Sequence, residues 1–491
     1  MPSRQRSLTV TMFYRFRWVF CQLDALQHCL PQNLRQYLNE LPETLDETYE
    51  RILRGINKAQ KNDAHRLLQC LTVTARPLRV EELAEILAFD FQLPSSGGIP
   101  TLKEAWRWDN HEEAVLSMCS SLITIVPSDN SWVVQFSHFS VKEYLTSPRL
   151  SRSHRDVSQF RIDLEPAHTI MAQACLATLL QLDDRTFNSG LEAIPLVKYA
   201  AEHWVVHAQF EKVASCVRDG MADLFDSSKP HFTAWLRVHD IDEFWDYFSP
   251  RLPPGVGSVS SLYYAALCGF YDLVENLIIK HPEQVNTRGG RIVAPLPAAL
   301  YKRHFHIADL LHRNGASVDV QGDSWWTPLH LSSAFGHFDI MRWLLDHGAD
   351  ANAPDYGRRT PLHIAAYTMQ CEAVRVLLEH NDDVNLKSNQ QKTPLYEALS
   401  GFLYYPEGNV VDIVQQLLEH GANPNIHDRS YSTFLHRASL KGWPEVTRLL
   451  LSYGAKVDEK DGQGRSPFQV AAIEGHHAIT KLLLEYGAVS Q

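Results

Sequence analysis

The chain has 491 residues, of which 45% are hydrophobic and 21% are charged. This composition is typical of globular proteins and excludes an intrinsically disordered or collagen-like chain. The 46 basic and 57 acidic residues give a formal net charge of -11 at pH 7. The chain therefore has no overall electrostatic attraction to nucleic acid or to anionic membranes.

Length, apolar runs and cysteine spacing indicate the number of domains, the solubility and the cellular compartment of the protein. At about 100–200 residues per domain, this length predicts two to four domains. No apolar run approaches the roughly 18–20 residues that a membrane span needs, so we expect a soluble chain. The eight cysteines are scattered and include no C-x-x-C pair, which indicates reduced thiols and a cytoplasmic location.

The N-terminal half is predicted to be helical with one hairpin. Helical periodicity covers residues 16–53 and 62–74 and resumes near Arg79. The β-branched and aromatic runs 122–126 and 132–136, separated by turn residues 127–131, predict a β-hairpin, and helix returns at 141–145. Three helices followed by a hairpin predict a winged-helix domain. We expect a helical tail over residues 1–57, the winged helix over 58–150, a helical connector over 151–255 and a repeat region over 256–491.

Winged helices often bind DNA, but the charges of this one argue against that role. Residues 58–150 hold 9 basic and 11 acidic residues, and the helix before the hairpin begins His111-Glu112-Glu113. A recognition helix that faces phosphates would not start with two glutamates. We therefore expect no nucleic-acid partner, and a winged-helix transcription regulator is kept as an alternative from another functional class.

The C-terminal half repeats with a period of 33 residues. Thr-Pro-Leu-His at 327–330 recurs at 360–363 and, as Thr-Pro-Leu-Tyr, at 393–396, with degenerate copies at 294, 433 and 466. A Gly-Ala pair keeps the same phase at 315, 348, 421, 454 and 487. Thr caps helix N-termini, Pro suits the first helical turn and Gly accepts the left-handed turn after a helix. Each repeat is therefore predicted to be two short helices and a turn, stacked on its neighbours.

These markers resemble the ankyrin repeat family, with about seven units between Ser258 and Ala488. The resemblance implies a solenoid that binds protein partners through the finger turns and inner helices of a concave face and rarely performs chemistry. The predicted fold class is therefore mainly α, with an ankyrin-repeat solenoid preceded by a helical region that contains a winged helix.

Ankyrin repeats commonly place Gly two residues before the Thr, at the finger turn, and here only Gly464 keeps that place. Large side chains at exposed turns are candidate interface residues, because aromatic and Arg anchors dominate binding energies. The candidate protein-binding residues of the fingers are Asp323, Trp325, Trp326, Tyr356, Arg358, Arg359 and Tyr431. The alternative is that Trp326 packs onto the neighbouring finger and that the two arginines are simply solvated.

An insertion and a set of histidines need separate interpretation. The step from Thr393 to Thr433 is seven residues too long, and the insertion carries Phe402, Tyr404 and Tyr405. Exposed aromatic side chains are costly, so these three either fold back on the array or contact a partner. The histidines of the repeated motif, His330, His363 and His436, occupy equivalent positions far apart in the sequence. We expect them to form hydrogen bonds at helix starts, and we expect no metal site and no cofactor.

Three N-terminal segments carry a second resemblance. They are Leu41–Leu53 (LPETLDETYERIL), Arg76–Leu83 (RPLRVEEL) and Phe136–Leu145 (FSHFSVKEYL). They resemble the region that follows the nucleotide-binding core in fungal NACHT–ankyrin proteins, which are STAND-type relatives of NOD-like receptors. The resemblance runs from about Phe16, through residues 198–204, to Gln491.

In that family, a winged-helix histidine reaches the bound diphosphate, and His138 matches it here. The family's phosphate loop, Gly-x-x-x-x-Gly-Lys-Ser/Thr, occurs nowhere in this sequence. Without its backbone N–H groups and its Lys, these residues cannot form a triphosphate site. His138 is therefore predicted to bind nucleotide only if an upstream nucleotide-binding module exists.

The sequence predicts a non-enzymatic interaction scaffold. The repeats would bind a protein partner, and the NACHT-associated winged-helix region would dock or regulate. No Gly-x-Ser-x-Gly elbow and no His-Glu-x-x-His pair points to catalysis. The first alternative is the incomplete product of a nucleotide-switched STAND receptor, a signalling NTPase of fungal self/non-self or stress recognition.

Overall fold

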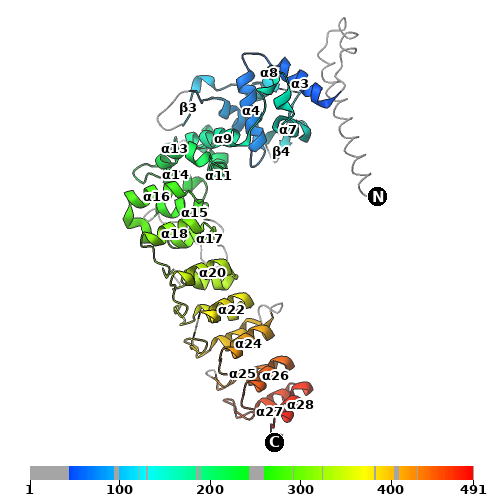
Figure 1. The fold of residues 1–491 in the computed structure, drawn as a ribbon, viewed down its shortest axis with the longest axis vertical. Coiled ribbons are helices and arrows are strands. Elements are labelled where there is room, and N and C mark those ends of the chain that lie inside the picture. The colour runs from blue at the N-terminus through cyan, green and yellow to red at the C-terminus, as the bar shows by residue number, and fades with distance from the viewer. Residues whose placement is uncertain are drawn as a thin grey trace. The chain divides into compact units, whose positions relative to one another are not determined.

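The computed structural model describes residues 44–92, 99–119, 121–128, 131–183, 186, 190–242, 259–290, 292–322, 325–380, 383–402, 409–427 and 430–489. The chain divides into two compact units, one that ends at Leu252 and one that begins at Pro253. Helices predominate in the described parts of both units, which confirms the predicted mainly α fold (Figure 1).

The first unit contains the winged helix and a helical bundle (Figure 1). Its α-helices are α3 (Leu45–Gly55), α4 (Lys61–Val73), α5 (Val80–Leu87), α6 (His111–Cys119), α7 (Phe139–Thr146), α8 (Arg155–Ser158), α9 (Leu164–Leu179), α11 (Val197–Ala208), α12 (Val213–Cys216), α13 (Arg218–Leu224) and α14 (His231–Val238). Short 3-10 helices occupy Glu104–Trp106, Leu150–Arg152 and Leu191–Ala193. The helical pattern expected from residue 16 ends in α3, and residues 1–43 lie outside the described residues.

The winged-helix sheet has three strands, β1 (Leu78–Arg79), β4 (Ile123–Ser128) and β5 (Ser131–Phe136), in the order β1-β5-β4. The antiparallel pairing of β4 with β5 confirms the predicted hairpin. Its connection is shorter than expected, because Pro127 lies opposite Trp132 and Ser128 opposite Ser131. Strand β1 was not predicted, since two residues are too few to show an alternating pattern. Two further strands, β2 (Phe89–Asp90) and β3 (Thr101–Leu102), form a separate ribbon.

A buried ion-pair cluster fixes the start of α5. The carboxylate of Glu82 is fully buried and accepts hydrogen bonds from the Arg76 guanidinium at 2.8 and 2.7 Å. It also accepts from the backbone N–H and the Nε of Arg79, at 2.8 and 3.0 Å. Burial alone would raise the pKa of Glu82, but these hydrogen bonds outweigh burial and lower it. Because an unpaired buried charge costs roughly 3–5 kcal/mol, the two arginines stabilise this part of the domain.

A second buried network joins the winged helix to the helical bundle. The hydroxyl of Tyr199, on α11, accepts from the backbone N–H of Ala75 at 3.1 Å and lies 2.8 Å from Nε2 of His207. Nδ1 of His207 lies 2.9 Å from Nδ1 of His168 on α9. Burial lowers the pKa of His207 to about 3, so its ring is neutral at physiological pH.

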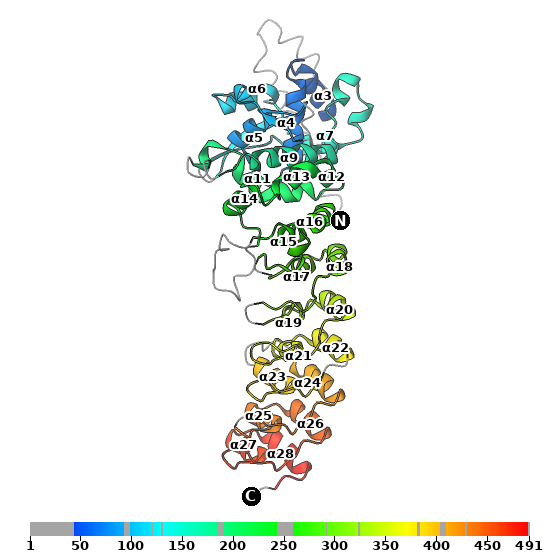
Figure 2. The same ribbon diagram turned by 90° about the vertical axis from the view of Figure 1, so that its left-hand side faces the viewer.

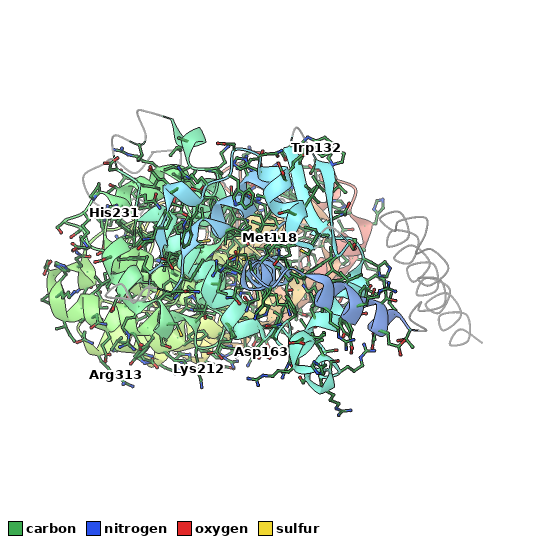
Figure 3. The ribbon with its side chains drawn as sticks, turned by 90° about the horizontal axis from the view of Figure 1, so that it is seen from above. Met118, Trp132, Asp163, Lys212, His231 and Arg313 are labelled. Carbon is green, nitrogen blue, oxygen red and sulfur yellow. The ribbon has the colours of Figure 1, made fainter. Side chains whose placement is uncertain are left out.

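Helix α9 lies at the centre of the bundle. It packs against α4 and also against α11, α12 and α13 (Figure 2). Met118 on α6 is buried, whereas Trp132 on β5 is half exposed (Figure 3). The winged helix and the helices after it therefore form one packed unit, with Trp132 at its surface.

The second unit is a stack of seven helix pairs, as predicted (Figure 2). Its inner helices are α15 (Ser261–Cys268), α17 (Pro295–Tyr301), α19 (Pro328–Phe335), α21 (Pro361–Tyr367), α23 (Pro394–Phe402), α25 (Phe434–Lys441) and α27 (Pro467–Ile473). Its outer helices are α16 (Tyr271–Lys280), α18 (Phe305–Arg313), α20 (Phe338–Asp346), α22 (Cys371–Glu379), α24 (Val410–Glu419), α26 (Pro444–Ser452) and α28 (His477–Glu485). A 3-10 helix, Pro282–Asn286, follows the first pair.

The repeated motif acts as the sequence predicted. Thr327 is the N-cap of α19, with Pro328 in the first turn. The Gly-Ala glycines after the outer helices adopt left-handed backbone, with φ of 82° to 92°; they are Gly315, Gly348, Gly421, Gly454 and Gly487. Glycine suits this conformation because it has no Cβ to clash with the backbone.

Three buried histidines, on α19, α21 and α25, each connect their inner helix to the next repeat. Nδ1 of His330 accepts from the backbone N–H of Thr327 at 3.2 Å, and Nε2 donates to the carbonyl of Arg359 at 3.0 Å. His363 contacts Thr360 at 3.1 Å and the Lys392 carbonyl at 3.1 Å in the same way. The equivalent distances from His436 are 3.2 Å to Thr433 and 3.0 Å to the Arg465 carbonyl. We call this set the histidine ladder, and it confirms the predicted role of these residues at helix starts.

The histidine ladder requires neutral imidazoles. A proton added to Nδ1 would face the Thr N–H that this nitrogen now accepts. Burial lowers the pKa of all three rings, and it lowers that of His363 to about 4. The starts of α19, α21 and α25 therefore each depend on a histidine hydrogen bond that acid would disable.

Acidification is expected to destabilise the repeat unit. An exposed imidazole has a pKa of about 6.5, so between that pH and the lower folded pKa the unfolded chain binds more protons than the folded one. The free energy of unfolding should therefore fall as the pH drops from about 6.5 towards about 4, by up to ~1.4 kcal/mol per pH unit and per histidine. Urea unfolding of the full chain, followed by hydrogen exchange in α19, α21 and α25, measures this.

The variant His363→Gln is the matched control. In the last repeat Gln469 already takes this place, and its side-chain oxygen accepts from the Ser466 N–H at 2.9 Å. Glutamine does not titrate, so the slope of stability against pH should be shallower in this variant. Equal slopes in the two proteins would contradict the role assigned to His363.

Candidate functional site

The candidate site consists of the loops that precede the inner helices. We call them the finger segments and number them by repeat. They are finger 2 (287–293), finger 3 (320–326), finger 4 (353–359), finger 5 (386–392), finger 6 (426–432) and finger 7 (459–465). Each ends just before the N-cap residue of its inner helix, so the cap fixes the end of the loop.

The finger tips hold large residues in left-handed backbone. The tip position lies two residues before the N-cap, and its φ is 61° at Trp325, 54° at Arg358, 61° at Gln391 and 57° at Tyr431. In finger 7 the same position is Gly464, with φ of 75°. Left-handed backbone costs a non-glycine residue roughly 1–2 kcal/mol. Four fingers therefore carry at the tip a strain that glycine would avoid, and in finger 2 Val293, which directly precedes the N-cap, has φ of 73° as well.

The tip side chains point into solvent. Trp325 is 53% exposed and Tyr431 61% exposed, and Arg358 is exposed as well. Tyr356, on the same finger as Arg358, is 78% exposed. The rings of Trp325 and Tyr356 meet edge to face across two neighbouring fingers, with centroids 6.4 Å apart. The structure thus places three of the sequence-predicted residues at exposed tips and a fourth, Tyr356, exposed on finger 4.

Two other predicted residues have structural partners. Trp326 is half-buried, and its Nε1 donates to the Asp355 carboxylate of the next finger at 3.3 Å. Arg359 donates through Nε to the same carboxylate at 2.9 Å. Asp355 is almost fully buried. Trp326 therefore packs onto its neighbour, as the alternative interpretation held, and Arg359 is paired and not merely solvated.

Hydrogen bonds also link the fingers to one another. Asn389 in finger 5 donates through its backbone N–H to the carbonyl of Gly357 at 2.8 Å and through its side chain to that of Tyr356 at 3.1 Å. Gly462 in finger 7 donates to the Ser430 carbonyl of finger 6 at 2.9 Å. Since the histidine ladder also bonds to the carbonyl that ends fingers 4, 5 and 7, neighbouring fingers hold each other in place.

A further ladder at the base of the fingers was missed by the sequence analysis. In each repeat an Asn or Asp bonds to backbone groups of the next repeat; for example, Asn425 donates to the Gly454 carbonyl at 3.0 Å and accepts from the Lys456 N–H at 2.8 Å. The set is Asn286, Asp319, Asn352, Asn385, Asn425 and Asp458. The regular spacing of these Asn and Asp residues in the sequence could have revealed the ladder.

Some predicted site residues cannot be placed. Asp323, Tyr404 and Tyr405 lie outside the described residues. Phe402 is the last residue of α23. Whether the inserted aromatic residues fold back or bind a partner stays a prediction.

His138 occupies the N-cap of α7. Its Nδ1 accepts from the backbone N–H of Ser140 at 3.2 Å and lies 2.6 Å from the Ser140 hydroxyl. That hydroxyl is 2.8 Å from the hydroxyl of Tyr49 on α3. His138 thus has a capping role in this chain, and its predicted role towards nucleotide stays a prediction.

Two other kinds of feature are absent from the described ranges. No group of three or more His, Cys, Asp or Glu side chains is arranged to hold a metal ion there. Nor does any described helix have both the length and the apolar character needed to cross a bilayer.

Comparison with known families identifies the parts of the chain. Residues 262–355 and 402–490 match the family model "Ankyrin repeats (3 copies)", and residues 333–378 match "Ankyrin repeats (many copies)". Residues 49–158 match "GPI inositol-deacylase, winged helix domain". This match covers α4 to α6 and the β4–β5 hairpin.

A curated relative and a solved structure are also similar. The azaphilone pigments biosynthesis cluster protein L of Monascus ruber is 31% identical over 320 residues, which are 60% of this chain. The match spans 64% of that relative's length. The crystal structure of the ankyrin repeat domain of Bcl-3, described as a member of the IkappaB family, is 28% identical, with a TM-score of 0.41, and covers 46% of this chain and 97% of that one. The family matches and the helix pairs together show that this chain carries ankyrin repeats preceded by a winged-helix domain.

Proposed function

We propose that this chain is a non-enzymatic interaction protein whose ankyrin fingers bind a protein partner. The row of large side chains in left-handed backbone at the tips carries this proposal. Backbone strain of this kind costs stability and persists chiefly where function requires it. Glycine at the tips would give a more stable array. We therefore infer that the large tip residues are retained because their side chains bind a partner.

The chemistry of the tips supports an interface. Trp, Tyr and Arg are the residue types that most often dominate the energy of protein–protein binding. Trp325, Tyr356, Arg358 and Tyr431 are all exposed. Exposed aromatic rings of this size are costly unless a partner covers them.

The links between fingers support binding as well. A loop that must order itself on binding loses affinity, whereas a loop already held in position does not. Tyr356 and Gly357 are held through their carbonyls by Asn389, and the histidine ladder holds the end of the same finger. The tip of finger 4 is therefore preorganised for a partner.

We further propose that the winged-helix unit docks or regulates and that the protein is cytoplasmic. Trp106, Trp108 and Trp132 expose 48%, 42% and 50% of their surface on this unit, which supports a docking role. The six cysteines within the described residues are free thiols, as a reducing compartment would keep them. DNA binding is disfavoured by the exposed Glu112 and Glu113 at the start of α6.

Glycine at the tips is expected to raise stability. Each of Trp325→Gly, Arg358→Gly and Tyr431→Gly should raise the free energy of unfolding by up to about 1 kcal/mol, because relief of the left-handed strain exceeds the extra entropy of an unfolded glycine. Urea unfolding of the repeat unit, read by hydrogen exchange in the full chain, measures the change.

The reverse substitution is the matched control. Gly464→Ala should lower the free energy of unfolding by about 1 kcal/mol, since a Cβ there meets open space and only the left-handed conformation opposes it. Tip glycines that destabilise the array would show that these side chains support the fold, and the argument from strain would fail.

Site-specific photo-crosslinking should locate the partner on the finger tips. With p-benzoylphenylalanine in place of Tyr356, irradiation of source cells should give a discrete protein adduct. The same group at Tyr453, an exposed C-cap residue of outer helix α26, should not. Adding Trp325→Gly and Arg358→Gly should reduce the Tyr356 adduct roughly tenfold, because hot-spot residues carry most of the binding energy.

The pattern of adducts decides the proposal. Adducts that form at Tyr453 and not at Tyr356 would place the interface on the outer helices. An adduct at Tyr356 that persists unchanged in the glycine variants would show that Trp325 and Arg358 do not anchor the partner.

A further inference from the structure

The finger segments differ in charge from the rest of the repeat unit. The six fingers hold nine Lys or Arg and five Asp or Glu residues. The remaining residues of 259–491 hold eleven basic and twenty acidic residues. The fingers taken together thus carry a net positive charge, most of it on fingers 2, 4 and 5, while the rest of the repeat unit is acidic.

In fingers 4 and 7, a buried aspartate is neutralised by an arginine of the same finger. The Asp355 carboxylate is 2% exposed and pairs with the Arg359 guanidinium at 2.8 Å. The Asp461 carboxylate is 3% exposed and pairs with Arg465 at 2.9 Å. Both carboxylates also accept from the backbone N–H of their own arginine, at 2.7 and 2.9 Å. These acids shape the loops and present no negative charge to a partner.

Three cations remain exposed on the fingers without an acidic partner among the described residues. They are Arg358 on finger 4, Lys387 on finger 5 and Lys460 on finger 7. Lys392 differs, because its Nζ lies 3.6 Å from the carboxylate of Glu397. A partner that brings carboxylates to Arg358 and Lys387 would therefore gain new ion pairs and break none.

Exposed aromatic residues precede and follow these two cations in the chain. On one side, Trp325 and Tyr356 form the edge-to-face pair of fingers 3 and 4. On the other side, Tyr431 of finger 6 stacks on His427 with ring centroids 5.1 Å apart. Fingers 3 to 6 thus present, in chain order, aromatic, basic and again aromatic side chains.

We propose that fingers 3 to 6 bind an acidic segment of the partner protein. Its carboxylates would face Arg358 and Lys387, and its apolar or aromatic residues would cover the Trp325–Tyr356 pair and Tyr431. This inference rests on the proposed function and adds the chemical class of the partner. Charge complementarity of this kind sets the rate and the specificity of association.

The charge pattern favours a protein segment over a nucleic acid. A nucleic-acid strand carries a phosphate at every nucleotide and needs a run of cations. In the sequence, the fingers interrupt such a run with acidic residues, as Glu459 does beside Lys460. An acidic peptide can place its carboxylates beside the two central cations and its uncharged residues elsewhere.

The test uses the full chain and a defined probe. Fluorescence anisotropy would measure binding of a short labelled peptide in which Glu and Asp alternate with Trp and Phe, against a peptide with Lys at the acidic positions. We expect the acidic peptide alone to bind, with affinity falling as salt rises. The double variant Arg358→Glu/Lys387→Glu should weaken binding at least about tenfold.

A matched variant controls for net charge. Arg313→Glu/Lys481→Glu makes the same charge change on outer helices α18 and α28, where both side chains are exposed (Arg313 is labelled in Figure 3), and should leave affinity within about twofold. Equal loss in the two double variants would show attraction to net charge alone and would overturn the proposal. Circular dichroism checks that all variants are folded.

Two further outcomes separate this inference from the function on which it rests. If the acidic peptide does not bind, or oligo-dT binds more tightly, while Tyr356 still gives its protein adduct, then the fingers bind a protein but the acidic chemistry is wrong. If neither the peptide nor the adduct is found, the proposed function fails as well.

Discussion

The repeat unit depends on a hydrogen-bond bridge that each motif histidine forms between two backbones. One ring nitrogen caps the inner helix at the Thr N–H, and the other donates to the carbonyl that ends the following finger. The bridge needs a buried, neutral ring, which the stacked helices provide. Helix capping, stacking of repeats and placement of fingers are thus one interaction. Short helices of this length would not be stable alone, so they form only as members of the array.

The finger tips contain strained backbone that contacts between repeats hold in place. Their tips hold Trp325, Arg358, Gln391 and Tyr431 in a backbone conformation that suits glycine, while finger 7 keeps Gly464. A loop can hold such residues only when its surroundings determine its path. Here the path is set by the Asn and Asp ladder at the base, by bonds between fingers such as that from Asn389 to Tyr356 and, in fingers 4 and 5, by the histidine ladder. Stability gained between repeats therefore supports strain at the finger tips.

Much of this fold was predictable from the sequence because its rules are local. Thr caps, Pro in the first turn and Gly after the helix recur in phase, and the hairpin showed as two β-branched runs. Other features depend on contacts distant in sequence. Strand β1 exists only through its pairing with β5. Adjacent residues Arg358 and Arg359 look alike in sequence, yet one is a free tip and the other pairs with buried Asp355. The sequence indicated which loops hold the candidate residues, but the structure decides which of their side chains reach solvent.

The most direct test of this account is a double-mutant cycle that joins the ladder to the tip. His330 bonds to the carbonyl of Arg359, next to the strained Arg358. Unfolding free energies would be measured for the wild type, His330→Ala, Arg358→Gly and the double variant. If the ladder holds the strained tip, loss of His330 should cost less when Arg358 is glycine, with a coupling energy of about 0.5–1 kcal/mol. Additive effects would show that the ladder and the finger tip are independent, which would contradict the account.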